Sequence, residues 1–113
     1  MWVFRALGIF TCYGLWRVTG IQALGRVIVA ALGSQNENIR SIAGIFLVKA
    51  RRQSEPLVEQ ALRHHKHLPI VLTILADIGD RRMEDEIREL SADRDPKIAE
   101  AAKQALRVLA INR

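Results

Sequence analysis

Helical periodicity is the feature of this sequence that most restricts its fold. Near the carboxyl end, apolar residues recur at steps of three and four, at Ile98, Ala101, Ala102, Ala105, Leu106 and Leu109. This spacing places them on one face of an amphipathic α-helix. No stretch longer than a few residues alternates apolar and polar residues with the period of two that is typical of a half-buried strand. We therefore predict an all-α fold.

Helix start signals recur along the chain. Asp95 followed by Pro96 is typical of a capping residue followed by the first helical position, where the missing N–H of proline costs nothing. The pair Glu55-Pro56 predicts another start, and either Asn36 or Asn38 predicts a third. Together with the end signals described next, these starts predict about six or seven helices.

Helix end signals lie between these starts. Gly79 follows an apolar helical stretch that begins at Pro69, and glycine is the residue that most often ends a helix. The pair Gly33-Ser34 predicts the end of an earlier helix over residues 20–32. Asp80 directly follows Gly79, and we expect it to cap the next helix rather than to bind a ligand.

Length and composition narrow the class of protein further. A chain of 113 residues fits one small domain and is too short for a two-domain enzyme. Half of the residues are hydrophobic and 26% are charged, which is typical of a globular chain rather than a disordered one. The single cysteine, Cys12, excludes an intramolecular disulfide framework and favours an intracellular location.

The helices show internal similarity. Residues 36–43 align with residues 95–102 at a shift of 59 positions, and this alignment matches Phe46-Leu47 with Ala105-Leu106. The shift is about twice a repeat of roughly 30 residues. Such a period is the sequence signature of a solenoid built from stacked helix pairs.

The carboxyl-terminal half also carries a family resemblance. Its pattern resembles a HEAT-like repeat, closest to the short class first noted in phycobilisome lyases, at Ile78-Gly79-Asp80-Arg81-Arg82, Ile87, Leu90, Asp93-Arg94-Asp95-Pro96-Lys97-Ile98, Ala101-Ala102 and Ala105-Leu106. The resemblance covers about residues 20–110 and is specific only over residues 75–110. It implies a short right-handed α-solenoid of antiparallel helix pairs that acts as a protein-interaction scaffold. It implies no chemistry and no cofactor.

The first nineteen residues differ in composition from the HEAT-like repeat domain, which we expect over residues 20–113. Glu37 is the first carboxylate of the chain, and residues 1–19 carry two charges, Arg5 and Arg17. A helix that is apolar on all sides is buried or lies in lipid. The 11 residues between the two arginines are fewer than the roughly 20 that a membrane-spanning helix needs.

Several roles are open for this apolar segment. It can pack on residues 20–32 as the first solenoid helix, dock on a partner chain, lie at a membrane interface, or serve as a cleaved targeting peptide. Aromatic side chains are frequent anchors of interfaces. We therefore predict partner or membrane contact through the aromatic residues of the segment, namely Trp2, Phe4, Phe10, Tyr13 and Trp16.

Basic residues in the middle of the chain form a second candidate contact. We predict a basic patch of Arg51, Arg52, Arg63 and Lys66, which is either a solvated face or a contact for an acidic protein, a phospholipid or a nucleic acid. His64, His65 and His67 lie close to the last two of these residues. They lack nearby carboxylate or thiol ligands at a spacing that suits zinc, so we predict no metal site.

The sequence therefore predicts a non-catalytic protein–protein interaction module, a small HEAT-like adaptor or accessory subunit of a larger assembly. It has no catalytic residues or cofactor by this prediction, and its amino-terminal helix also allows association with a membrane surface or with a second copy. The alternative is a nucleic-acid-binding HEAT-like module that uses a basic face, although the repeats lack interleaved aromatic residues. A pigment-lyase role rests on the resemblance alone.

Overall fold

The computed structural model describes residues 2–111, apart from the side chain of Trp2. Within this part the chain is helical, with seven α-helices, two short 3-10 helices and no strand. The prediction of an all-α fold with six or seven helices is confirmed. The elements are α1 (Trp2–Thr19), α2 (Gln22–Ala31), α3 (Glu37–Ala50), η1 (Arg51–Gln53), α4 (Glu55–Arg63), α5 (Leu68–Ile78), η2 (Arg81–Met83), α6 (Glu84–Leu90) and α7 (Pro96–Ile111).

The chain divides into two compact units near the start of α4. Unit 1 is Met1–Leu57 and contains α1, α2, α3 and η1. Unit 2 is Val58–Arg113 and contains α5, η2, α6 and α7. Helix α4 begins in unit 1 and continues into unit 2. Each unit is described by itself.

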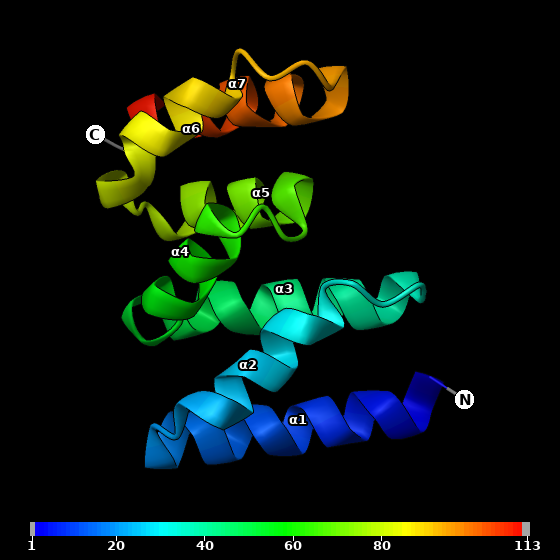
Figure 1. Ribbon diagram of the computed structural model, residues 1–113. Coiled ribbons are helices and arrows are strands. Elements are labelled where there is room, and N and C mark those ends of the chain that lie inside the picture. The colour runs from blue at the N-terminus through cyan, green and yellow to red at the C-terminus, as the bar shows by residue number, and fades with distance from the viewer. Residues whose placement is uncertain (1, 112–113) are drawn as a thin grey trace. The chain divides into compact units, whose positions relative to one another are not determined.

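In unit 1, α1 packs against both α2 and α3, and α2 packs against α3. Helices α1 and α3 run in the same direction, and α2 returns between them (Figure 1). The fully buried side chains of this unit include Trp16, Ile28, Ile39 and Leu47. The apolar segment 1–19 therefore supplies part of the core of unit 1, through Ala6, Ile9 and Trp16.

In unit 2, α7 packs against both α5 and α6. Helices α5 and α7 run in the same direction, and α6, which lies between them in the sequence, runs the opposite way, so the order of directions matches that of α1, α2 and α3 (Figure 1). The fully buried side chains of this unit include Leu72, Leu75, Ile87 and Leu109.

Side-chain caps begin the helices at the positions that the sequence marks. The Oδ1 of Asn36 accepts hydrogen bonds from the backbone N–H groups of Asn38 and Ile39, at 2.9 and 3.3 Å. Asn36, rather than Asn38, is thus the cap of α3. The Oδ1 of Asp95 accepts from the backbone N–H of Lys97 at 2.9 Å. These bonds satisfy donors that have no partner within the helix.

Gly79 ends α5 as predicted, in the left-handed conformation with φ 82°. Its N–H donates to the carbonyl of Ala76, and the N–H of Asp80 donates to the carbonyl of Leu75. This pair of bonds is the Schellman motif. The predicted cap also forms, because the Oδ1 of Asp80 accepts from the backbone N–H of Arg82 at 3.1 Å and so begins η2.

The end of α4 has the same motif with a histidine in place of glycine. His65 has φ 55°, and its N–H donates to the carbonyl of Leu62, while the N–H of Lys66 donates to the carbonyl of Ala61. His67 also has a positive φ, at the N-cap of α5. These histidines shape the short connection between α4 and α5.

Candidate functional site

One side of α1 exposes large apolar side chains. We call this the α1 surface and define it by Val3, Phe4, Leu7, Phe10, Leu15 and Val18, each of which is about half exposed or more. Phe4, at 73%, is the most exposed aromatic residue of the set. Val3, Leu7, Phe10 and Val18 follow steps of four, three and eight along the helix and so lie on one face. The other two extend this face sideways.

Two threonine hydroxyls of α1 are turned inward to the helix backbone. The hydroxyl of Thr11 donates to the carbonyl of Leu7 at 2.9 Å, and the hydroxyl of Thr19 donates to the carbonyl of Leu15 at 2.6 Å. Threonine hydroxyls commonly bond the carbonyl four residues earlier in this way. Both hydroxyls thus already have a partner within the helix.

The opposite side of α1 lies in the core of unit 1. Trp16 is 0% exposed, and its indole ring lies against Gly25 of α2. Gln53 holds the end of the helix, because its Nε2 donates to the carbonyl of Trp16 at 2.6 Å and its Oε1 accepts from Arg17 at 2.9 Å. The prediction that Trp16 forms part of the contact surface thus needs correction, because this indole is used to close the core.

The remaining predicted aromatic contacts divide between exposed and half-buried positions. Phe10 is exposed, yet one edge of its ring meets Phe46 of α3 at a centroid distance of 4.9 Å. Tyr13 is half-buried and stacks on Phe46 at 4.2 Å. Phe4 is exposed, and the side chain of Trp2 lies outside the described residues. Phe4 and Phe10 are therefore the predicted aromatic residues that the structure places on the α1 surface.

Aliphatic members of the α1 surface were missed by reasoning that singled out aromatic residues. The helical spacing of Val3, Leu7 and Val18 indicates that they share one face of the helix. It does not show that this face is exposed, because α1 is apolar on all sides and has no polar face to mark the solvent side. Other exposed apolar residues of unit 1 are Ile21, Val27 and Ile45. In unit 2, Ile111 is the exposed large apolar residue among those described.

The net charge of the protein is concentrated on the same unit. Residues 1–57 hold seven basic and two acidic residues, which accounts for a charge of +5. Residues 58–113 hold ten of each and are formally neutral. Unit 1 thus combines positive charge with the exposed apolar side chains.

The predicted basic patch is split between the units. Arg51 and Arg52 lie in η1 of unit 1, and Arg63 and Lys66 lie at the end of α4 in unit 2. All four are exposed. Arg51 has an unusual backbone, with φ 45° and ψ −108°.

Comparisons with known proteins leave the family open. No family model matches the chain, and neither a curated protein nor a solved structure matches it. Among the described residues, no helix has both the length and the apolar content that crossing a membrane requires. The HEAT-like resemblance therefore stays a prediction.

Proposed function

We propose that the protein is a non-catalytic interaction module that docks on a protein partner through the α1 surface. In this role it is a small adaptor or accessory subunit of a larger assembly. The observation that carries the proposal is the row of exposed apolar side chains on α1, in a unit that has seven basic and two acidic residues. Exposed apolar patches of this kind mark interaction sites in many proteins.

The energetics favour an occupied α1 surface. Full burial of one large apolar side chain is worth about 1.5–3 kcal/mol. Phe4 and Phe10 are the aromatic side chains exposed on this surface, and aromatic residues are frequent anchors of interfaces. Arg5 and Arg26 are exposed in the same unit and suit a partner with acidic residues around an apolar centre.

We further infer that the helices form a HEAT-like α-solenoid. Two features support this fold. Helices α1–α3 and helices α5–α7 share one order of directions within their own units (Figure 1), and residues 36–43 match residues 95–102 in sequence. A solenoid of so few repeats needs polar caps or a partner at its ends. An apolar first helix fits a partner there.

Sedimentation of the full chain tests the docking role. Without its partner, the wild-type chain is expected to self-associate at micromolar concentration through its exposed apolar side chains. The double variant Phe4→Gln/Leu7→Gln should be monomeric, with an unchanged helical circular dichroism spectrum. Ile111→Gln is the matched control, because it removes an exposed apolar side chain from unit 2. A wild-type chain that is monodisperse and stable as a monomer without detergent would contradict the proposal.

A vesicle flotation experiment separates a protein partner from a membrane surface. The full chain is mixed with vesicles of neutral lipid and with vesicles that contain phosphatidylserine. Flotation with the anionic vesicles alone, lost in Phe4→Gln/Leu7→Gln, would show that the occupant of the α1 surface is a membrane. No flotation, together with self-association, supports the protein partner.

The alternative is a nucleic-acid-binding module, and the charge of +5 on unit 1 is the observation that favours it. It predicts binding to DNA or RNA that weakens steeply with salt and is lost in Arg51→Glu/Arg52→Glu. Absence of binding at low salt in a fluorescence anisotropy titration would end this alternative.

A further inference from the structure

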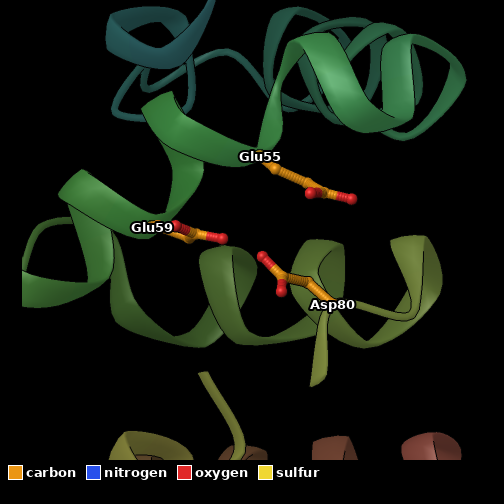
Figure 2. A group of neighbouring side chains, drawn as sticks. All are labelled: Glu55, Glu59 and Asp80. Atoms are coloured by element: carbon orange, nitrogen blue, oxygen red, sulfur yellow. The ribbon is translucent and has the colours of Figure 1, made fainter. Parts of the chain in front are cut away.

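Two carboxylate side chains are buried together in unit 2. Glu59 of α4 is 7% exposed, and Asp80, the cap of η2, is 4% exposed. Figure 2 shows the two carboxylates pointing toward each other, and an oxygen of one lies within 4.8 Å of an oxygen of the other. Glu55 stands one helical turn before Glu59 on α4 and is half-buried. Buried acidic residues are rare unless a partner compensates them.

The hydrogen bonds of this pair are incomplete. The Oδ1 of Asp80 accepts from the backbone N–H of Arg82 at 3.1 Å. The Oδ2 of Asp80 and the Oε2 of Glu59 are buried and have no hydrogen-bond partner among the described residues. An ionised carboxylate can only accept hydrogen bonds, so two ionised carboxylates cannot satisfy each other. One proton on either group turns it into a donor toward the other carboxyl.

Nearby positive charges compensate the pair only in part. The Nη2 of Arg82 lies 2.9 Å from the Oε2 of Glu59, as an ion pair without hydrogen-bond geometry, and its side chain is 65% exposed. Arg63 lies 4.0 Å from the Oε1 of Glu59 and is also largely exposed. A solvated arginine stabilises a buried carboxylate less than a buried arginine does. Part of the repulsion between the carboxylates of Glu59 and Asp80 therefore remains.

These surroundings change the acidity of Glu59. Burial, followed by the side-chain hydrogen bond to Asp80 and the negative charge of Asp80, raises the pKa of Glu59 to about 7, against the lowering effect of Arg82 and Arg63. The titration of Glu59 therefore depends on the charge of Asp80 beside it.

We propose that Glu59 and Asp80 share one proton at neutral pH and that this proton acts as a switch on unit 2. With the proton bound, a carboxyl–carboxylate hydrogen bond joins α4 to the turn Gly79–Met83. Without it, two negative charges face each other in a buried position, and this attachment loosens. The switch lies in unit 2 and does not depend on the docking role proposed for the α1 surface.

A proton fits this position better than a divalent cation. The guanidinium of Arg82 already lies 2.9 Å from the Oε2 of Glu59. A metal ion at that oxygen would be repelled by the arginine. A proton between the two carboxyls occupies little space and brings one positive charge where a divalent cation brings two.

Nuclear magnetic resonance of side-chain carboxyl carbons tests the shared proton in the full chain. The carboxyl carbon of Glu59 is expected to titrate with a midpoint near pH 7, because its pKa is raised to about 7 from the ordinary glutamate value of 4.5. In Asp80→Asn, the amide can donate to Glu59, so the midpoint of Glu59 should fall by one unit or more, which is at least tenfold in its proton affinity. Glu59→Gln should abolish the near-neutral titration. A wild-type Glu59 that titrates near the ordinary value of 4.5 would overturn the proposal, whether or not the variants fold.

Hydrogen exchange and added metal test the switch itself. After correction for intrinsic rates, amide exchange in α4 and in the turn Gly79–Met83 should become severalfold faster above the Glu59 midpoint, and Glu59→Gln should remove this pH dependence. Exchange that is unchanged through the midpoint would overturn the switch. Magnesium or calcium chloride should leave the Glu59 carbon unmoved at neutral pH. A saturable shift, absent in Glu59→Gln, would show a cation site instead.

Discussion

Gly25 of α2 lies so close to the indole ring of Trp16 that a Cβ atom built on it would be 2.7 Å from Cε2 and 2.9 Å from Nε1. It would also collide with the Cδ1 of Leu57. The end of a leucine side chain can turn away, but a fully buried indole ring has little room to move. The absence of a side chain at position 25 is thus what allows Trp16 to pack between α1 and α2.

Gly25→Ala should destabilise unit 1. Overpacking lowers the free energy of unfolding by about 1–3 kcal/mol. The higher helix propensity of alanine relative to glycine offsets about 0.5–1 kcal/mol of this loss. We expect a net loss of about 1–2 kcal/mol in the free energy of unfolding, measured by urea denaturation. Gly14→Ala is the control, because a Cβ there meets nothing within 4 Å, and it should stabilise α1 by about 0.5–1 kcal/mol. Equal effects of the two variants would show that Trp16 is not held against Gly25.

Asn36→Ala should remove the cap of α3. The side chain of Asn36 accepts from two backbone N–H groups at the start of this helix, and loss of such a cap costs about 1 kcal/mol. Asn38→Ala changes the same residue type two positions later, and we expect it to alter the unfolding free energy by less than half as much. A larger effect at Asn38, in the same denaturation experiment, would place the cap at the other asparagine.

Arg51→Gly should stabilise the protein. The backbone of Arg51 has φ 45° and ψ −108°, outside the regions that residues with a Cβ normally adopt, and such strain costs about 1–3 kcal/mol. Glycine relieves it and raises the entropy of the unfolded chain, so we expect a net gain of about 1 kcal/mol in thermal unfolding experiments. Arg52→Gly is the neighbouring control with an ordinary φ, and it should destabilise. A loss of stability in Arg51→Gly would mean that the side chain of Arg51 stabilises the fold by more than the strain of its backbone destabilises it.

The stability of the protein should fall as the pH rises from about 4.5 to about 7. The pKa of Glu59 is about 7 in the folded chain, against 4.5 for an unperturbed glutamate. Between these values the folded state holds a proton that the unfolded state has lost, so each step up in pH favours unfolding. Above the folded pKa, Glu59 is ionised in both states, so its proton no longer stabilises the fold and the effect does not change further with pH. We expect a difference on the order of 1–3 kcal/mol across the window, in denaturation midpoints measured over a pH series.

Glu59→Gln is the comparison for this pH series. It has no proton to lose, so its stability should lack the part of the slope that Glu59 contributes, and all other titrating groups are common to both proteins. Parallel stability curves for the two proteins would contradict a raised pKa of Glu59. A wild-type curve that rises through the window relative to the variant would mean that the pKa is lowered instead.

Sequence reasoning recovered the helices better than the site. The positions of Asn36, Gly79 and Pro96 marked helix ends correctly because caps, left-handed glycines and an initial proline act within about one helical turn. The candidate contact residues stay a prediction: Phe4 and Phe10 are exposed, but Trp16 is buried. Composition showed that residues 1–19 are apolar, and it contained no signal for which side of the helix faces solvent.

The sequence by itself determined the all-helical class, a number of about six or seven helices and most of their ends, because these depend on residues that are neighbours along the chain. Only the tertiary structure decided that Trp16 closes a core against Gly25 while Phe4 stays exposed. Only the tertiary structure also brought Glu59 to Asp80, a capping residue on another element. Such pairings depend on how whole helices pack, and no pattern within a single helix encodes them.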